Sequence, residues 1–436
     1  MSSPRRPASL DPLALMWRAR PLLLGSLLAM PLAALAQAQD SNPYYFGGSL
    51  GLTHVSNIYR TAAGSTAPQG QANDDTVTTA SLLGGVDLRL GREHLTANAA
   101  LQSNHYERNS LLDNLGYNGR MGLDWATVDN ISGTISLGGS RQLSSNVPGY
   151  GYSPVYVKNV ETDYSADALT RIGLVTRWTL EADLNYNRRS FSADTYKSLD
   201  YQQTSYSLGP TYRPSELLRI GVDLRHTRGS RPFYAVDIDP GTQQFVYVAN
   251  DFNRDDVDLN VYWKASGANQ FEARLSSGRS HHLTSAGQDF SGFTGQLNWY
   301  WQPTGRLSFT SQLIRDTGLQ TAFASFLGQS SSSFSEDQLV TTARSYASYQ
   351  YSAKLSFNAS ASFSRGRLAV NVPNQTPPES LNLTNTDYAA SLGAAWQISR
   401  GISFSCQMGR QERTGDIQLN PYKANNVGCV GQWIVY

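Results

Sequence analysis

Apolar and polar residues alternate along most of the chain, from Tyr44 to the C-terminal Tyr436. Within residues 218–225, Leu, Ile, Val and Leu take every second position, and Arg, Gly, Asp and Arg stand between them. Residues 256–264 and 354–363 show the same pattern. A period of two predicts strands whose two faces meet different surroundings. At about 10–14 residues these segments exceed the five or six that are usual in soluble sheets, and they suit tilted membrane strands.

The separators between these segments are alternately short and long. The short ones are compact and rich in Gly, Pro, Asp and Ser: 91–93, 128–130, 214–216, 266–268, 303–305 and 398–401. The long ones are polar: 61–75, 145–161, 190–200, 229–250, 281–288, 318–337 and 366–379. Short periplasmic turns and long extracellular loops are typical of outer-membrane barrels. The layout therefore predicts an all-β, transmembrane antiparallel β-barrel of roughly 18 strands with both termini on the periplasmic side.

Composition agrees with a membrane barrel. Charged residues make up only 16% of the chain and aromatic residues 11%, against roughly 25% charged residues in soluble proteins. The mean hydropathy of −0.38 is not that of a uniformly apolar membrane protein. In a barrel, however, only alternate residues need to face lipid. Aromatic residues at predicted strand ends suit the membrane interface: Tyr44, Tyr45, Trp125, Trp178, Trp263, Trp299, Trp301 and Trp396. The alternating C-terminal segment 430–436 resembles the strand that the outer-membrane assembly machinery recognises.

The N-terminus predicts a cleaved signal peptide over residues 1–38. Arginines precede an apolar run at residues 21–35, which is followed by the small-x-small cleavage site Ala36-Gln37-Ala38. No later apolar stretch is long enough to span a membrane as a helix, so any crossing must be made by strands. We therefore expect residues 39–436 to form one barrel in the bacterial cell outer membrane. Arg5-Arg6 alone does not make a twin-arginine signal, because nothing else of that motif surrounds it.

Charged residues on the polar face of the predicted strands are candidates for lining the lumen. They are Asp87, Arg89, Arg120, Asp124, Glu181, Asp183, Arg219, Asp223, Arg225, Asp256, Asp258, Lys264, Glu272, Arg274 and Lys354. Barrels of this size leave an aqueous channel, so the charges could orient a hydrated solute. The alternative is that they pair across the wall and hold its shape. Six tyrosines could stack on sugar rings or anchor the barrel in the interface: Tyr106, Tyr150, Tyr152, Tyr156, Tyr234 and Tyr247.

Cys406 and Cys429 fall on the last two predicted strands and share the lipid-facing parity. Directly opposed residues of an antiparallel pair have Cα atoms about 4.5–5.5 Å apart, which is within reach of a disulfide. The compartment is oxidising. The two cysteines are thus a possible disulfide, and a metal or catalytic role is disfavoured.

Catalytic and metal-binding motifs are missing from the sequence. It has no Gly-x-Ser-x-Gly elbow and no His-Glu-x-x-His helix, and its histidines lack metal spacing apart from His281-His282. The run Asp237–Gly241 lacks the further ligands of a calcium loop. We expect no cofactor, no metal and no enzyme, although a Ser-His lipase would leave no local motif. With 35 basic and 34 acidic residues, the charge indicates no nucleic-acid partner.

Several short segments resemble the exosortase-associated exopolysaccharide outer-membrane β-barrels, an EpsL-like family. They are 44–60, 104–108, 112–117, 123–125, 131–144 and 426–432. The resemblance extends over the mature chain through short, degenerate motifs. It implies a role in exopolysaccharide biosynthesis or export across the outer membrane, and it supplies no catalytic residues.

The expected function is therefore a channel for exopolysaccharide. Its expected partners are outer-membrane lipids, the polymer itself, and the periplasmic and inner-membrane polysaccharide synthesis and export machinery. Two alternatives share the gross features: a general or sugar-selective diffusion porin, and a non-transporting barrel whose loops bind surface polysaccharide. A porin usually has a loop folded into its lumen, and residues 229–250 are long enough for that role.

We predict that translation starts at Met16, because residues 16–20 before the apolar run make a compact signal peptide of ordinary length. N-terminal sequencing of the precursor, with signal peptidase blocked, tests this. Recovery of any peptide from residues 2–15 would contradict it.

Overall fold

The computed structural model describes residues 42–62, 64–67, 70–128, 130–144, 156–173, 177–238, 245–284, 289–317, 338–371, 380–416 and 421–436. It contains one sheet of 18 strands. The first nine are β1 (Tyr44–Val55), β2 (Asp75–Leu90), β3 (Glu93–Tyr106), β4 (Asn114–Ala126), β5 (Ile131–Leu143), β6 (Val160–Ile172), β7 (Trp178–Phe191), β8 (Tyr201–Ser215) and β9 (Leu218–Ile238). The others are β10 (Phe245–Trp263), β11 (Asn269–His282), β12 (Phe290–Trp301), β13 (Leu307–Thr317), β14 (Gln338–Gln350), β15 (Leu355–Asn371), β16 (Ser380–Ser399), β17 (Ile402–Gly415) and β18 (Tyr422–Val435).

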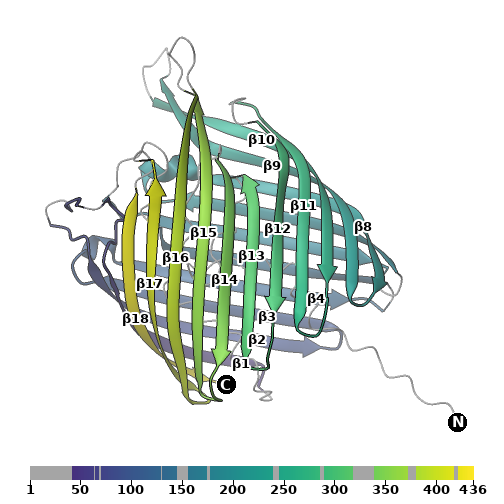
Figure 1. Cartoon of the computed structure of the whole chain (residues 1–436), viewed down its shortest axis with the longest axis horizontal. Helices are drawn as coiled ribbons and strands as arrows, with labels where there is room; N and C mark the ends of the chain where they lie inside the picture. Colours follow the sequence, from purple (N-terminus) through teal and green to yellow (C-terminus); the bar gives the residue numbers. More distant parts are fainter. Residues whose placement is uncertain are drawn as a thin grey trace.

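The sheet closes on itself. Every strand pairs antiparallel with its neighbours in sequence, and β1 also pairs with β18 from Phe46↔Val435 to Val55↔Asn426. The strands at the front cross those at the back at a steep angle, and the described chain starts and ends near the same rim (Figure 1). This confirms the predicted antiparallel barrel of 18 strands. Within the described residues, no helix is long and apolar enough to cross a membrane.

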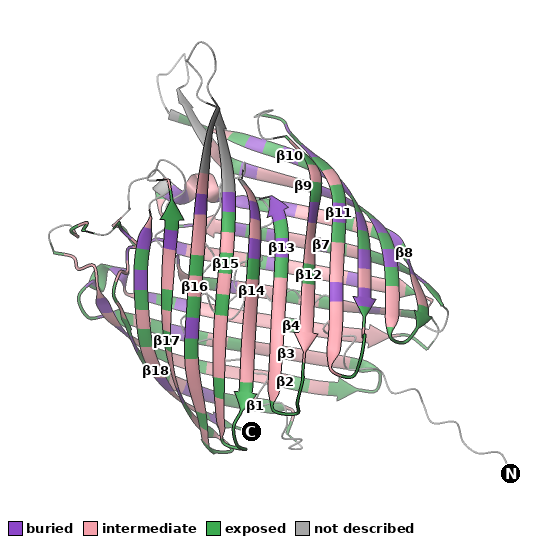
Figure 2. Cartoon of the chain, viewed as in Figure 1, coloured by how far each residue is buried: buried purple, intermediate pink, exposed green. Residues whose placement is uncertain are grey.

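The two faces of the wall differ as the alternation predicts. In β10, Val257 and Leu259 are exposed on the outer surface, whereas Asp256, Asp258 and Asn260 are buried on the inner one. Bands of exposed and less exposed residues alternate along the strands in Figure 2. The outer face is apolar because lipid tails surround it, and the inner face is polar because water can enter the lumen. Such a barrel belongs to the bacterial outer membrane.

Tryptophans mark the periplasmic boundary of this apolar outer face. The seven tryptophans that the structure describes are Trp125, Trp178, Trp263, Trp299, Trp301, Trp396 and Trp433, and each lies near the periplasmic end of its strand. Five rings from β10 to β13 form a continuous stack whose centroids are 5.0–6.0 Å apart: Trp263, Phe271, Trp299, Trp301 and Phe309. An amphipathic ring is most stable at the level of the lipid headgroups, so this stack marks the periplasmic edge of the membrane-spanning band.

The predicted long loop at residues 229–250 is wrong. β9 continues to Ile238 and β10 begins at Phe245, so most of this segment is an extension of two paired strands. The apolar alternation stops on either side of this segment, where Arg228, Asp251 and Asn253 take outward positions. Above the membrane a strand needs no apolar outer face, and the hydrophobic signal therefore ends before the strand does. Residues 229–238 and 245–250 thus belong to paired strands and not to an inward-folded constriction loop.

The assignment of the two faces predicts different effects for adjacent substitutions in β10. Leu259→Arg should destabilise the barrel by about 2–4 kcal/mol, because it places a charge in hydrocarbon. Asn260→Arg should be tolerated, because Asn260 faces the lumen and already donates a hydrogen bond to the Asp223 carboxylate. Heat-modifiability of each variant on gels measures the difference. Equal behaviour of both variants would contradict the assignment.

Candidate channel lumen

The predicted lumen residues lie on strands and share one face. Arg89, Arg120, Asp124, Glu181, Asp183, Arg219, Asp223, Arg225, Asp256, Asp258, Glu272 and Arg274 have the parity of the buried inner positions. Lys264 directly follows β10, at the periplasmic rim. Lys354 lies in the turn before β15, where its ammonium donates to the Ile398 carbonyl over 3.2 Å, so it belongs to the rim rather than to the wall.

Buried ion pairs join many of these charges. Arg225 on β9 contacts Asp258 at 2.8 Å and Asp256 at 3.1 Å. Arg254 is only 2% exposed, and it contacts Asp256 at 2.9 Å and Asp316 at 3.2 Å. Its guanidinium also donates to the hydroxyls of Thr294 and Thr317. Each charge in this group thus has a partner of opposite sign, as buried charges require.

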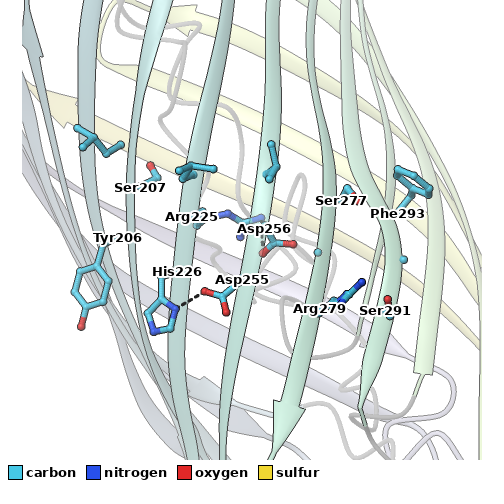
Figure 3. Close-up of a pocket in the computed structure, with 15 residues that line it drawn as sticks. Tyr206, Ser207, Arg225, His226, Asp255, Asp256, Ser277, Arg279, Ser291 and Phe293 are labelled. Carbon is cyan, nitrogen blue, oxygen red and sulfur yellow. Dashed lines mark hydrogen bonds and ion pairs between the residues drawn. The ribbon is translucent and has the colours of Figure 1, made fainter.

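Figure 3 shows this part of the wall with the side chains of both faces. Arg225 and Asp256 belong to the inner set. The adjacent residues His226 and Asp255 lie on the outer face, where the imidazole and the carboxylate are 2.6 Å apart. Adjacent residues of β9 and β10 therefore form two different pairs: Arg225 with Asp256 in the lumen, and His226 with Asp255 on the outer surface.

Further pairs continue around the wall. Arg189 on β7 contacts Asp163 at 2.7 Å and Glu161 at 3.0 Å. Arg413 on β17 contacts Asp387 at 2.7 Å. The sequence reasoning missed Glu161, Asp163, Arg189, Arg254, Asp316, Asp387 and Arg413, although each has the inner parity of its strand. They lie near the extracellular ends of the strands, where the apolar signal fades.

The opposite part of the wall is mostly neutral. On β12 to β17 the inner face carries hydroxyl and amide side chains: Thr294, Gln296, Asn298, Thr310, Gln312, Thr342, Ser356, Asn358, Ser360, Ser362, Ser364, Ser391, Ser405 and Gln407. They form short cross-strand bridges, such as Gln312 to Asn298 at 2.9 Å and Ser360 to Ser391 at 2.6 Å. Groups that both donate and accept can exchange these bonds for water or for another hydroxyl. The lumen thus has a wall rich in paired charges over β6–β11. The wall over β12–β17 is predominantly neutral, with the charged residues Asp316, Arg344, Asp387 and Arg413 as exceptions.

The described residues of the loop after β1 (56–62, 64–67 and 70–74) fold onto the inner side of the extracellular mouth. Tyr59 is 1% exposed and packs with Val77 and Tyr106, which have the inner parity of β2 and β3. Arg60 reaches the other side of the seam, where its guanidinium donates to the Gln411 amide oxygen on β17 at 3.1 Å. These contacts place Tyr59 and Arg60 on the inner side of the mouth, whereas residues 229–238 and 245–250 are parts of paired strands. Nothing in the sequence of this loop distinguishes it from the other polar loops.

Asn109 locks this loop in place. Its side-chain oxygen accepts from the Tyr59 hydroxyl at 3.2 Å and from the Ala72 amide at 3.0 Å. Its side-chain nitrogen donates to the Ala72 carbonyl at 3.0 Å and to the buried Asp75 carboxylate at 2.8 Å. Burial and the nearby Asp75 and Tyr156 raise the pKa of Tyr59 to about 12, so its hydroxyl remains a donor. Tyr156 packs on Tyr59 with centroids 4.9 Å apart.

A second inward element covers β7–β9. The short 3-10 helix η4 (Asp194–Leu199) buries Tyr196, whose ring lies 6.1 Å from that of Phe191. Among the tyrosines considered for sugar stacking, Tyr106 is occupied in the loop cluster, and Tyr247 packs edge-on against Phe233 at 5.1 Å. Tyr150 and Tyr152 lie outside the described residues. Loop packing therefore accounts for Tyr106 and Tyr156 without a sugar.

Cys406 and Cys429 are directly opposed on β17 and β18, and a disulfide joins them with a Cα–Cα distance of 4.0 Å. Both lie on the outer face, away from the lumen. The bond crosslinks the last hairpin next to the β1–β18 seam. Among the described residues, no three His, Cys, Asp or Glu side chains are grouped so as to hold a metal.

No protein-family model matches the chain, and no curated protein sequence matches it. Among solved structures it is similar to the FrpB iron transporter from Neisseria meningitidis, at 13% identity and a TM-score of 0.39, covering 87% of this chain and 64% of that one. It is also similar to the outer membrane protein opdK from Pseudomonas aeruginosa, at 10% identity and a TM-score of 0.41, and the match covers 90% of this chain and 98% of that one. A third similar structure is Pseudomonas aeruginosa OccK2 (OpdF) in complex with glucuronate, at 11% identity and a TM-score of 0.45, and the match covers 90% of this chain and 98% of that one.

The fold itself defines the class of protein. A closed antiparallel barrel with an apolar outer face, a polar inner face and a periplasmic aromatic boundary is an outer-membrane β-barrel. With 18 strands it has the size at which such barrels enclose an aqueous channel.

Removing the Asn109 side chain should release the loop and widen the mouth. We expect Asn109→Ala to raise the single-channel conductance in planar bilayers, because Tyr59 and Ala72 lose their shared partner. Asn253→Ala, an exposed position at the same end of β10, is the matched control and should leave conductance unchanged. Identical conductance of wild type and Asn109→Ala would show that the loop does not narrow the path.

Proposed function

We propose that this barrel is a channel that gives a hydrated exopolysaccharide a route across the outer membrane. The observation that carries the proposal is the predominantly neutral wall of hydroxyl and amide side chains over β12–β17. It faces a wall on which Arg189, Arg225 and Arg254 are paired with carboxylates. Taking a polar polymer through hydrocarbon is prohibitively costly, and a water-filled barrel removes that cost without any chemistry.

The paired charges support a solute of low charge. Arg225, Arg254 and Arg189 each contact carboxylates on their own wall, so these three charges are compensated within the protein. A strongly anionic or cationic substrate would favour a wall dominated by one sign. A chain of hydroxylated sugars, in contrast, needs many weak and exchangeable hydrogen bonds.

The neutral wall suits transit rather than tight binding. Ser360, Ser391 and Asn298 already bond to neighbouring side chains, and they can exchange these bonds for sugar hydroxyls at little net cost. A polymer can then slide past a row of equivalent groups. The sequence resemblance to EpsL-like barrels points to the same class of substrate. The drive would come from inner-membrane synthesis and from periplasmic export partners.

A diffusion porin for small sugars is the second candidate. The observation that favours it is the inward loop 56–74, because a narrowed mouth suits a small solute better than a polymer. Both candidates use the same neutral wall. They differ in the effect of removing the barrel: an export channel predicts loss of secreted polymer, and a porin predicts slower uptake of small sugars.

Deleting the gene should abolish secreted exopolysaccharide and leave uptake of small sugars unchanged. Wild-type protein should restore secretion. The lumen variant Asn358→Trp/Ser362→Trp should restore it poorly, because two indoles project from the neutral wall of β15. Secreted polymer in the medium and on the cell surface is the measurement.

The matched control is Phe357→Trp/Phe363→Trp, which places the same side chains on the outer face of the same strand. It should restore secretion fully. Wild-type polymer in the deletion strain would exclude export, and slowed sugar uptake in that strain would support the porin. Normal transport with loss of polymer only from the cell surface would instead indicate a polysaccharide-binding barrel.

A further inference from the structure

Two arginines stand side by side on the outer surface near the extracellular ends of β13 and β15. Arg315 pairs in register with Thr341 on β14, and Thr341 pairs with Arg365 on β15. Both arginines are exposed, and both have the outward parity of Leu313 and Phe363. Their strands are two apart, roughly 9–10 Å at the usual strand spacing, so the two long side chains can converge above the Thr341 hydroxyl.

Among the residues that the structure describes, these two arginines have no carboxylate partner, in contrast to the paired arginines of the lumen. Arg225, Arg254 and Arg413 each contact carboxylates on the inner wall. Around Arg315 and Arg365, the described part of the chain provides no carboxylate within ion-pair distance. Two neighbouring guanidinium groups repel each other unless an anion lies between them. Their arrangement suits the planar, bidentate recognition of a phosphate.

An apolar groove begins directly beneath this pair. Its floor is the outer face of β14, where Ala343 and Ser345 follow Thr341 at every second position. Leu313 on one side and Phe363 on the other form its walls. The Phe363 ring packs edge-on against Tyr388 at 5.5 Å. The groove has a volume of about 800 Å³, and it crosses the strands from β12 to β17, where Arg410 and Glu412 line its far end. Its part over β13–β15 lies one outward position below the arginines.

The level of the arginine pair fixes which leaflet it meets. The stacked tryptophans lie at the periplasmic ends of β10–β13, and the arginines lie at the opposite ends of β13 and β15. The pair therefore sits at the headgroups of the outer leaflet, with the groove reaching into the hydrocarbon below. Clusters of basic residues at a membrane surface bind anionic lipid headgroups. The anionic lipid of this leaflet is a phosphorylated, multiply acylated glycolipid.

We propose that β13–β15 form a binding site for the phosphorylated glycolipid of the outer leaflet. One phosphate binds between Arg315 and Arg365, with the Thr341 hydroxyl as a further donor. One acyl chain lies along Ala343 and Ser345, between Leu313 and Phe363. The charge of the headgroup and the position of the chain match the two parts of the site, which a soluble anion or a plain hydrocarbon would not do. The site lies outside the lumen and does not depend on the transported solute.

The neighbouring basic residues are not part of this phosphate site. Arg410 and Lys423 both contact the Glu412 carboxylate, at 3.0 Å and 3.1 Å. Their charge is thus compensated within the protein. This contrast makes Arg315 and Arg365 the pair to test.

Native mass spectrometry of the detergent-purified barrel, titrated with defined lipids, tests the proposal. The probes are bis-phosphorylated lipid A, the same lipid after dephosphorylation, and phosphatidylglycerol. Wild type should bind the phosphorylated lipid A at least about tenfold more tightly than either other lipid. Arg315→Ala/Arg365→Ala should lose that preference. Ala343→Trp should also weaken binding of lipid A, because it fills the groove while both arginines remain.

The control is Arg306→Ala, an exposed arginine in the periplasmic turn between β12 and β13. It should bind lipid A as wild type does, and heat-modifiability on gels should show that all variants are folded. Undiminished binding by the double variant would overturn the proposal, as would equal binding of phosphatidylglycerol by wild type. An equal loss in Arg306→Ala would mean that overall charge rather than this site holds the lipid. Undiminished binding by Ala343→Trp would exclude the groove as the acyl site.

Discussion

The hydrogen-bonding demand of the backbone governs this structure. Inside hydrocarbon no water can satisfy a free N–H or C=O group, so every strand must have a partner on both sides. The pairing of β1 with β18 meets that demand for the last two free edges. Once the sheet is closed, each strand has one face toward lipid and one toward the lumen, and the alternation of apolar and polar residues follows. The long hairpin of β9 and β10 shows where the demand ends: above the membrane the pairing persists, but the apolar face does not.

The same constraint explains how charges are placed. Arg254 and Asp316 can be nearly inaccessible on the inner wall because each satisfies the other and because water reaches the lumen around them. On the outer wall within the hydrocarbon, no water would offset the desolvation cost of such a pair. Charges on the outer face occur in the extracellular parts of the strands, and they include His226 with Asp255 and Arg410 with Glu412. The protein therefore separates compensated charge in the lumen from charge that faces the headgroups.

The sequence predicted the fold well because the barrel repeats a local pattern. The parity of Leu259 and Asn260, the number of strands and the opposition of Cys406 and Cys429 all follow from counting residues by twos. Contacts across the barrel could not be predicted in this way. Arg254 and Asp316 are 62 residues apart, and Arg60 and Gln411 are separated by 351. Each of these contacts depends on the register of every strand between the partners. The fold of loop 56–74 depends on Asn109, whose four bonds come from the arrangement of two loops rather than from any local motif.

The position of the tryptophans has a consequence for how the barrel adapts to membranes of different thickness. Rings concentrated at the periplasmic ends hold that rim at a fixed depth, whereas the opposite rim carries flexible arginine side chains and strands that continue above the bilayer. A thicker or thinner bilayer is then accommodated almost entirely at the cell surface, where long side chains can extend or fold back. Hydrophobic mismatch would move the outer loops relative to the lipid, while the turns that face periplasmic partners keep a constant height.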